Sequence, residues 1–387
     1  MTPSSSPHPR HDLTPPPFFL NSKKIKRRTM LLFMMIFCGC GPHTLITSES
    51  TPTLSYIETS TRKTSQGKEV KNQQTLSVDE GTLYDAAGFP FVIRGINNPH
   101  SYFKDKTLRA LPTIKSLGFN TVRIIWCADN LPRHQRCDPK DIHQAEALDQ
   151  ILQKLHQLKL IGVLTLQNVT GSNDPNDIDK MVSYLTSSRI KQLLLHHQSY
   201  LILNIANEWY GSWDKLSTYV NTYKEALNKM RNHGLNHVVM IDARGWGQDF
   251  SSITENYQQL LAFDPQIIFS LHLYDTFADE QKIKDSFAFV RDQRIPFVAG
   301  EFACSHYPFQ PPIPCETIMA EANQREQPYG YIAWSFTGNN QELTGLNLVS
   351  SDDWVSLTDY GKRIVHDENG IKASSRQACW FEPNQCL

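Results

Sequence analysis

The chain has 387 residues, of which 40% are hydrophobic and 10% aromatic, so it can bury a large core and wholesale disorder is excluded. Its formal net charge at pH 7 is -1, which gives no electrostatic basis for a nucleic-acid partner. The length is within the range of a single α/β barrel. We therefore expect a monomeric protein that does not bind nucleic acid.

The positive charge is concentrated at the start of the chain. Residues 1–39 contain six lysines and arginines against one aspartate, and a short apolar stretch follows the basic cluster. This pattern is typical of a secretory signal and is too short for a mature membrane span. The stretch ends in a sequence that resembles a bacterial lipobox, with Cys40 as the lipid acceptor and Phe37 at the usual leucine position. An ordinary cleaved signal, or a translation start at Met30, is the alternative.

These features predict an exported protein that is attached to a bacterial membrane, at the cell surface or in the periplasm, only through a lipid on Cys40. Without lipidation we expect secretion. Residues 40–75 are rich in Ser, Thr, Lys and Gln, which predicts a flexible linker. The folded domain is expected over residues 76–373, beginning with a small hairpin at residues 81–88, and a tail is expected over residues 374–387.

Apolar runs then recur along the chain with helix-like segments between them, and they are continuous rather than alternating in polarity. Such runs are typical of parallel strands that are buried on both faces. Eight of them over this length predict a (β/α)8 TIM barrel. A doubly wound sheet is the alternative, although no G-x-G-x-x-G turn follows the first run. The eight predicted strands are Phe91–Ile96, Thr121–Trp126, Gly162–Leu166, Leu201–Ala206, His237–Asp242, Ile267–Leu273, Pro296–Gly300 and Tyr331–Ser335.

One of the predicted helices has a particularly clear apolar face. Its apolar residues recur at helical spacing, and Gly234 supplies a residue suited to the left-handed conformation at the helix end. The face is made of Leu216, Tyr219, Val220, Tyr223, Leu227 and Met230.

Two of the eight cysteines, Cys38 and Cys40, belong to the predicted leader and anchor, and the other six form three close couples. Six cysteines allow 15 pairings, so the sequence alone does not choose among them. In an exported chain the short spacings favour Cys127–Cys137, Cys304–Cys315 and Cys379–Cys386. A zinc site is the rival interpretation, but the chain has no C-x-x-C spacing, and we expect no metal.

Two glutamates follow predicted strands at the same end of the barrel. Glu208 follows the fourth strand and Glu301 the seventh. Side chains at the C-terminal strand ends of such a barrel form its active-site face. Two carboxylates on either side of one bond suit glycoside hydrolysis, in which one donates a proton and the other attacks or activates water.

Further polar and aromatic residues lie at the same strand ends. Arg123 is inside the second strand, where a carboxylate partner such as Glu301 would offset the cost of burying its charge. Aromatic planes can stack on the apolar faces of sugar rings, as the neighbouring Trp209 and Trp213 could. Taken singly, each residue has a purely structural interpretation, and their coincidence at one end of the strands favours a site. The other members are His100, His272, Tyr274, Trp246 and Trp334.

The segment NIANEWYG, residues 204–211, resembles the acid/base signature of clan A retaining glycosidases, and of glycoside hydrolase family 5 in particular. The tryptophan after Asn-Glu is similar to the bacterial β-mannanases of that family. The resemblance covers roughly residues 78–373. Six more stretches agree in order and spacing: FVIRGINNPHSYFKD (91–105), GFNTVRIIW (118–126), DARGWGQD (242–249), HLYD (272–275), VAGEFA (298–303) and YIAWSFTGNN (331–340).

The resemblance implies a role for each site residue and a β-linked polysaccharide as substrate, with no cofactor. Glu208 would be the general acid/base and Glu301 the nucleophile. Asn207 would bind the sugar 2-hydroxyl, and Arg123 would keep Glu301 ionised. The remaining residues would orient the carboxylates (His272, Tyr274), form the stacking floor (Trp334) or line the site (His100, Trp246).

Four residues depart from the family pattern. Gln167-Asn168 stands where the mannanases usually have a His-Asp pair, which removes titratable groups and could alter the acid/base pKa or the substrate choice. Phe336 replaces a common tryptophan, and Asn347 replaces a common aspartate. The leading hypothesis is a retaining endo-β-1,4-mannanase. The alternatives are an endoglucanase or other β-glycan hydrolase on the same scaffold, and a non-catalytic glycan-binding lipoprotein.

Overall fold

The computed structural model describes residues 61–63, 69–71, 75–128, 131, 137, 144–304 and 311–386. The predicted signal leader, Cys40 and most of the predicted linker lie outside the described residues. Within that linker, β1 (Thr61–Lys63) and β2 (Glu69–Lys71) pair as antiparallel strands. Part of the predicted linker therefore has regular secondary structure. No sequence pattern indicated it, because two short strands can pair through their backbones without a pattern of apolar residues.

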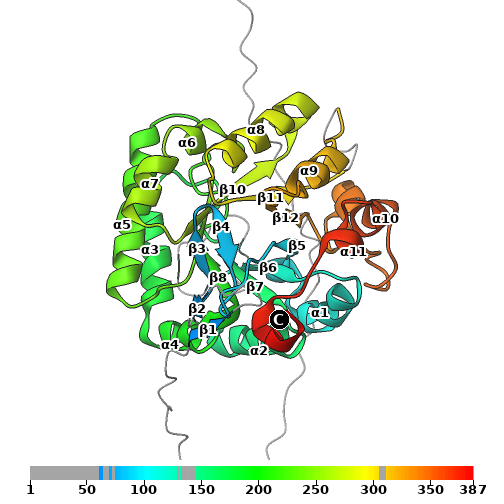
Figure 1. Cartoon of the computed structure of the whole chain (residues 1–387), viewed down its shortest axis with the longest axis horizontal. Coiled ribbons are helices and arrows are strands. Elements are labelled where there is room, and N and C mark those ends of the chain that lie inside the picture. The colour runs from blue at the N-terminus through cyan, green and yellow to red at the C-terminus, as the bar shows by residue number, and fades with distance from the viewer. Residues whose placement is uncertain are drawn as a thin grey trace, which may run out of the picture. The chain divides into compact units, whose positions relative to one another are not determined.

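Eight parallel strands close into one barrel in chain order, and the last strand pairs with the first (Figure 1). The prediction of a (β/α)8 barrel is confirmed. The strands of the barrel are β5 (Arg94–Asn98), β6 (Thr121–Trp126), β7 (Ile161–Leu166), β8 (Leu201–Asn204), β9 (Val239–Asp242), β10 (Ile267–Leu273), β11 (Phe297–Phe302) and β12 (Gly330–Ala333). Every residue of these strands is buried, as expected for parallel strands covered on both faces.

Helices surround the barrel (Figure 1). In the described part of the chain, none of them combines the length and apolarity that a membrane span needs. The helices are α1 (Thr107–Ser116), α2 (Ala145–Gln157), α3 (Pro175–Thr186), α4 (Ser188–His196), α5 (Leu216–Asn232), α6 (Ser251–Thr254), α7 (Tyr257–Phe263), α8 (Glu280–Asp292), α9 (Cys315–Ala322), α10 (Asp359–His366) and α11 (Ile371–Ser374).

The helix with the clear apolar face is α5. It buries Tyr219, Tyr223 and Met230, and the residues predicted for this face pack on the core. Gly234 follows the helix end with a φ of +79°, and its N–H donates to the carbonyl of Arg231 at 2.9 Å. A left-handed residue at this position satisfies a carbonyl that the last turn leaves without a helical partner. The predicted helix and its stop are confirmed.

Several strand boundaries differ from the predicted ones. The first strand begins at Arg94 and continues through two asparagines to Asn98. The Asn97 amide is satisfied by carbonyls of β11 and β12, including that of Gly300 at 3.2 Å. Strand β11 likewise continues through Glu301 to Phe302. Glu301 therefore lies within a strand rather than after it.

The amino-terminal end of the barrel is covered by a hairpin of β3 (Ser77–Asp79) and β4 (Thr82–Tyr84) (Figure 1). It begins four residues before the predicted hairpin. The backbone of Val78 exchanges two hydrogen bonds, of 2.9 and 3.0 Å, with the side chain of Gln266, which immediately precedes β10. The hairpin is thereby fixed to the end of the barrel opposite the carboxyl ends of the strands.

Three disulfides join the predicted couples, Cys127–Cys137, Cys304–Cys315 and Cys379–Cys386. The second links the residue three positions beyond Glu301 to the start of α9. The third closes a small loop in the C-terminal segment, which is red in Figure 1 and lies over α2. The predicted pairing is confirmed.

Candidate active site

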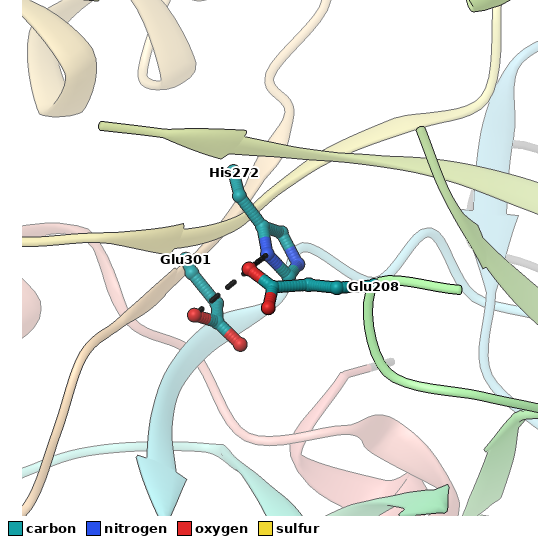
Figure 2. Close-up of side chains that lie close together, drawn as sticks. All are labelled: Glu208, His272 and Glu301. Carbon is teal, nitrogen blue, oxygen red and sulfur yellow. Dashed lines mark hydrogen bonds and ion pairs between the residues drawn. The ribbon is translucent and has the colours of Figure 1, made fainter. Parts of the chain in front are cut away.

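Glu208 and Glu301 reach the carboxyl end of the barrel from different strands. Glu208 follows β8, Glu301 lies in β11, and their exposed fractions are only 8% and 4%. One carboxylate oxygen of each and one ring nitrogen of His272 all lie within 4.8 Å of one another. Figure 2 shows the imidazole beside the two carboxylates, with the same ring atom, Nδ1, 2.9 Å from Glu208 Oε1 and 3.7 Å from Glu301 Oε2. The predicted carboxylate pair is thus assembled in one place.

Arg123 is the hub beneath this pair, and it is fully buried in β6. Its Nη1 donates to Glu301 Oε1 at 2.6 Å and to Asn97 Oδ1 at 2.8 Å. Its Nη2 donates to Asn207 Oδ1 at 2.7 Å and to Asn204 Oδ1 at 3.0 Å. A planar guanidinium suits this fixed array of acceptors. The predicted Arg123–Glu301 ion pair is present.

Asp242 is a site residue that the sequence interpretation did not assign. It is fully buried at the end of β9, and its Oδ2 accepts the backbone N–H of Glu208 at 3.0 Å and lies 3.4 Å from Arg123 Nη2. Glu208 has a φ of +45°, a left-handed conformation that costs a non-glycine residue about 1–3 kcal/mol. Asp242 thus holds the strained backbone of Glu208. The sequence feature that could have identified Asp242 is a carboxylate at the last position of an apolar strand.

His272 carries a positive charge at neutral pH. Burial disfavours its imidazolium, but the negative charges of Glu301 and Asp242 outweigh this and raise its pKa to about 10. Its Nε2 lies 3.5 Å from Asp242 Oδ1, and its Nδ1 faces Glu208. The pKa of Asp242 is lowered to about 2: burial acts to raise it, and His272 and Arg123 overcome that effect. His272 is therefore a buried cation between three carboxylates.

Glu301 is subject to opposing influences. Burial raises its pKa above the usual range, while the charges of His272 and Arg123 act to lower it. The Tyr274 hydroxyl donates to its Oε2 at 3.1 Å, and burial together with the nearby Glu301 charge raises the pKa of that phenol. Tyr274 thus remains a protonated donor, and both Glu301 oxygens have polar partners as predicted.

Asn207 connects Arg123 to Glu208. Its Oδ1 accepts from Arg123, and its Nδ2 donates to Thr170 Oγ1 at 3.2 Å and lies 3.4 Å from Glu208 Oε2. Because the amide oxygen is occupied by the guanidinium, the amide orientation is fixed and the N–H groups face the carboxylate side. This is the position that the sequence predicted for a sugar hydroxyl donor.

Trp246 lies at the junction of three loops around Glu208. It adopts a φ of +59° between two glycines that also have positive φ, Gly245 and Gly247. A Cβ on Gly171 would come within 2.3 Å of its indole, and one on Gly211 would come within 3.0 Å. The half-buried indole is thus wedged against the loops that follow β7 and β8. Trp246 thus spaces the loop that carries Glu208.

Trp334 immediately follows β12, and a chain of two asparagines fixes its indole N–H. Its indole N–H donates to Asn339 Oδ1 at 3.2 Å, and Asn339 in turn donates to Asn347 Oδ1 at 2.8 Å. The amide oxygen of Asn347 is therefore the acceptor that this network uses, so the departure at this position leaves that contact in place. Phe336, the other departure nearby, is buried in the core.

Not every predicted aromatic is available to a ligand. Trp209 is fully buried among the tyrosines of α5, 6.2 Å from the ring of Tyr219 in a stacked arrangement. The suggestion that it stacks on a sugar is wrong, because the following helix covers it. Trp213 is 51% exposed. His100 is buried and stacks on Trp126 with ring centroids 5.2 Å apart, while its Nδ1 contacts Thr107 Oγ1 at 2.7 Å.

The two substituted residues after β7 do different things. Asn168 pairs with both backbone groups of Ala128, at 2.9 and 3.0 Å, and so fixes the segment after β6. Gln167 is buried beside Tyr102, and its Oε1 has no hydrogen-bond partner among the described residues. Of the residues that differ from the family pattern, Gln167 is thus the one with a buried oxygen that lacks a hydrogen-bond partner among the described residues.

The described residues include one trio with the spacing of a metal site, Glu208, His272 and Glu301. A metal ligand must be a neutral imidazole, whereas the pKa of about 10 keeps His272 protonated on both nitrogens near neutral pH. In this charge arrangement the trio is held together by a proton shared among an imidazole and two carboxylates.

A closed parallel barrel with two buried, opposed carboxylates at the carboxyl ends of its strands defines a glycoside hydrolase. The family model for cellulases of glycosyl hydrolase family 5 matches residues 84–340. The chain belongs to this family.

Among characterised proteins, the chain is similar to a mannan endo-1,4-beta-mannosidase of Salipaludibacillus agaradhaerens, with 35% identity over 79% of this chain and 95% of that one. A mannan endo-1,4-beta-mannosidase of Cellvibrio japonicus is 32% identical over 77% of this chain and 67% of that one. Among solved structures, the β-mannanase from Thermomonospora fusca superposes with a TM-score of 0.71 at 29% identity, covering 79% of this chain and 99% of that one.

Proposed function

We propose that this glycoside hydrolase is a retaining endo-β-1,4-mannanase that cleaves internal bonds of mannan and glucomannan. Its relatives support this substrate, since those at 35% and 32% identity are mannan endo-1,4-beta-mannosidases. The resemblance of the residues around Glu208 to those of the bacterial β-mannanases agrees with this substrate. The substrate is held without a cofactor, by side chains at the carboxyl ends of the strands.

The observation that carries the mechanism is the approach of the two carboxylates. Oxygens of Glu208 and Glu301 come within 4.8 Å of each other. Carboxyls of inverting enzymes are about 6.5–9.5 Å apart because a water molecule must fit between one of them and the sugar, whereas those of retaining enzymes are about 5–5.5 Å apart. The short separation favours double displacement.

In the first step an oxygen of Glu301 attacks the anomeric carbon. The bond from that carbon to the leaving oxygen breaks, and Glu208 gives its proton to the leaving oxygen. In the second step Glu208 takes a proton from water, the water oxygen attacks the same carbon, and the bond to Glu301 breaks. Arg123 and Tyr274 contact both oxygens of Glu301, so they stabilise it each time it leaves as a carboxylate.

Charge balance supports this division of roles. His272 and Arg123 are two buried cations, and Asp242, whose pKa is about 2, is one anion. An ionised Glu301, in contact with Arg123, supplies the second anion. Buried charges are costly unless they are compensated, so this is the resting state that the site best accommodates.

The remaining site residues contact the sugar. Asn207 directs its N–H groups toward the 2-hydroxyl, Trp334 provides the floor for stacking, and Trp246 lines the site. The buried His100 supports the site from behind, through its stacking on Trp126. We propose export and a lipid anchor at Cys40 on the strength of the leader sequence. Cys40→Ala should then release active protein from membranes, and a variant that stays bound after a high-salt wash would contradict the anchor.

The substrate is tested by measuring the reducing ends that purified protein releases from mannan, glucomannan and carboxymethylcellulose. We expect rapid release from the first two and little from the third. Hydrolysis confined to carboxymethylcellulose would replace the mannanase with an endoglucanase. Binding without hydrolysis of any β-glycan would contradict the enzymatic assignment.

A further inference from the structure

A cavity of about 360 Å³ opens at the end of the barrel opposite the two glutamates. Its walls come from the last turns of α2, from η4 (Gln198–Tyr200) and from the C-terminal segment. Tyr200 immediately precedes β8, whereas Glu208 follows it, so the length of the strand separates the cavity from the catalytic residues. The volume is within the range of about 300–1,000 Å³ that is typical of ligand sites.

The aromatic part of the cavity is held rigidly. Trp380 and Tyr200 both line it and stack with ring centroids 5.6 Å apart. The backbone N–H of Trp380 donates to the buried carboxylate of Asp85 at 2.9 Å. The Cys379–Cys386 disulfide closes the loop around Trp380, and Lys159 forms an ion pair with Glu382 in the same loop. These attachments fix the position of the aromatic surface.

The rim of the cavity is polar and accessible. Gln153, His156 and Gln157 on α2 and His196 on α4 line it, and all four are exposed. The described residues that line it include no lysine, arginine, aspartate or glutamate. A charged ligand would therefore find no opposite charge, whereas amide and imidazole groups can exchange hydrogen bonds with hydroxyls. An aromatic surface bordered by such groups matches the apolar ring faces and hydroxyl edges of a neutral sugar.

We propose that this cavity is a second, non-catalytic binding site for a β-linked glycan chain. The kind of glycan rests on the proposed function, since the polymer held here would be the one cleaved at the other end of the barrel. A second attachment point keeps the enzyme on its polymer between cleavage events, because the second contact is made at a raised effective concentration.

The experiment uses the full-length Glu301→Ala protein, which does not degrade its ligand, with β-1,4-mannohexaose and cellohexaose as probes in isothermal titration calorimetry. We expect two sites for a hexaose on each chain. Trp380→Ala in this background should weaken one site at least about tenfold, as expected when a stacking surface is lost, and leave the other unchanged. Gln153→Ala with Gln157→Ala should weaken the same site without altering the packing of Trp380.

Phe263→Ala is the matched control, because Phe263 is an exposed aromatic at the end of α7, and both sites should persist. With Glu301 present, Trp380→Ala should retain the hydrolysis of mannohexaose. A single site for each chain, or a second site that neither set of substitutions weakens, would overturn the proposal. Failure of the mannanase assignment is distinguishable, since wild-type protein would then leave mannohexaose intact while a Trp380-dependent site could still bind either hexaose.

Discussion

The Arg123 guanidinium lies 2.6 Å from Glu301 Oε1 and at the same time 2.7 Å from Asn207 Oδ1, one residue before Glu208. One fully buried cation therefore sets the position of one glutamate directly and that of the other through its neighbour. Because Asp242 also contacts both Arg123 and the backbone of Glu208, the two carboxylates form one electrostatic unit. Their ionisation and geometry should respond together when either support is removed.

Arg123→Gln should lower kcat/KM on mannan by about 10²–10³-fold, the usual cost of losing a preorganised charge contact. The dependence of kcat/KM on pH tests the role of Arg123 more specifically. Arg123 acts to lower the pKa of Glu301, so its loss raises that pKa. Because the nucleophile must be ionised, the acid limb of kcat/KM should move to higher pH.

Arg94→Gln provides the control. Arg94 is equally buried, but it lies at the amino-terminal end of β5, where it donates to the carbonyl of Tyr329 at 2.8 Å. Its loss should lower the free energy of unfolding and leave the acid limb in place. An unshifted acid limb in Arg123→Gln, or the same shift in both variants, would contradict the assigned role.

His272 should make stability depend on pH above neutrality. Its pKa rises from 6.5 in the unfolded chain to about 10 in the folded protein. The stabilisation is therefore fully present below pH 6.5 and is lost as the pH rises toward 10, a change on the order of a few kcal/mol.

Urea unfolding of the wild type over this interval should show the decline, and His272→Gln should flatten it. The exposed His233 at the end of α5 gives a matched substitution, His233→Gln, that should keep the wild-type slope. Equal slopes for wild type and His272→Gln would show that the imidazole is not a buried cation.

Hydrophobic patterning was sufficient to predict the eight strands because each is covered on both faces. It failed at Asn97 and Glu301, where a polar residue continues a strand because other strands of the barrel supply its partners. Those partners come from strands far away in the sequence, so no local pattern reveals them. The carboxylate pair could be predicted because both glutamates end apolar runs.

Asp242 and Trp209 show the limit of the same reasoning. Asp242 also ends an apolar run, but its role depends on Arg123 and His272, which only the closed barrel brings to it. Trp209 lies next to Glu208 in sequence and faces the opposite way, because the left-handed backbone at Glu208 and Tyr210 turns it under α5. Neighbouring positions in a loop do not share a direction as alternate positions in a strand do.

Gly171→Ala should impair catalysis through Trp246. The added methyl would meet the indole at 2.3 Å, and Gly171 also has a φ of +75°. We expect a loss of about 1–3 kcal/mol in stability and about 10²-fold in kcat/KM, since displacement of the indole moves the loop that bears Glu208. Gly234→Ala has a similar φ of +79° but meets nothing within 4 Å, so it should cost stability alone. Equal losses of kcat/KM in both variants would contradict the inference that contact between Gly171 and Trp246 positions the loop of Glu208.

Removal of two of the disulfides should affect stability similarly but catalysis differently. Replacing Cys304 and Cys315 with serine should cost about 2–3 kcal/mol and also lower kcat/KM several-fold, because the bridge begins three residues after Glu301. Replacing Cys379 and Cys386 should cost a similar amount of stability and spare the hydrolysis of mannohexaose, since that loop lies at the other end of the barrel. Thermal unfolding and steady-state kinetics on both double variants test this contrast.

The division of labour between the glutamates is tested with a substrate that has a good leaving group, such as a dinitrophenyl β-mannoside. On polymer, either substitution abolishes most activity, so that assay does not distinguish them. With the activated substrate, Glu208→Ala should still form the glycosyl-enzyme, because the leaving group needs no proton. It should then stall, because no base activates water. Azide needs no base, and it should attack the α-linked intermediate to give the β-glycosyl azide.

Glu301→Ala should behave in the opposite way. It lacks the nucleophile, so no intermediate forms and no burst of leaving group is seen. Azide can occupy the space that the carboxylate leaves between Arg123 and Tyr274, and attack from that side gives the α-glycosyl azide. The two products differ only in anomeric configuration, which proton NMR resolves. The same azide anomer from both variants would mean that one of the two roles is misassigned, and a first wild-type product of inverted configuration would exclude double displacement altogether.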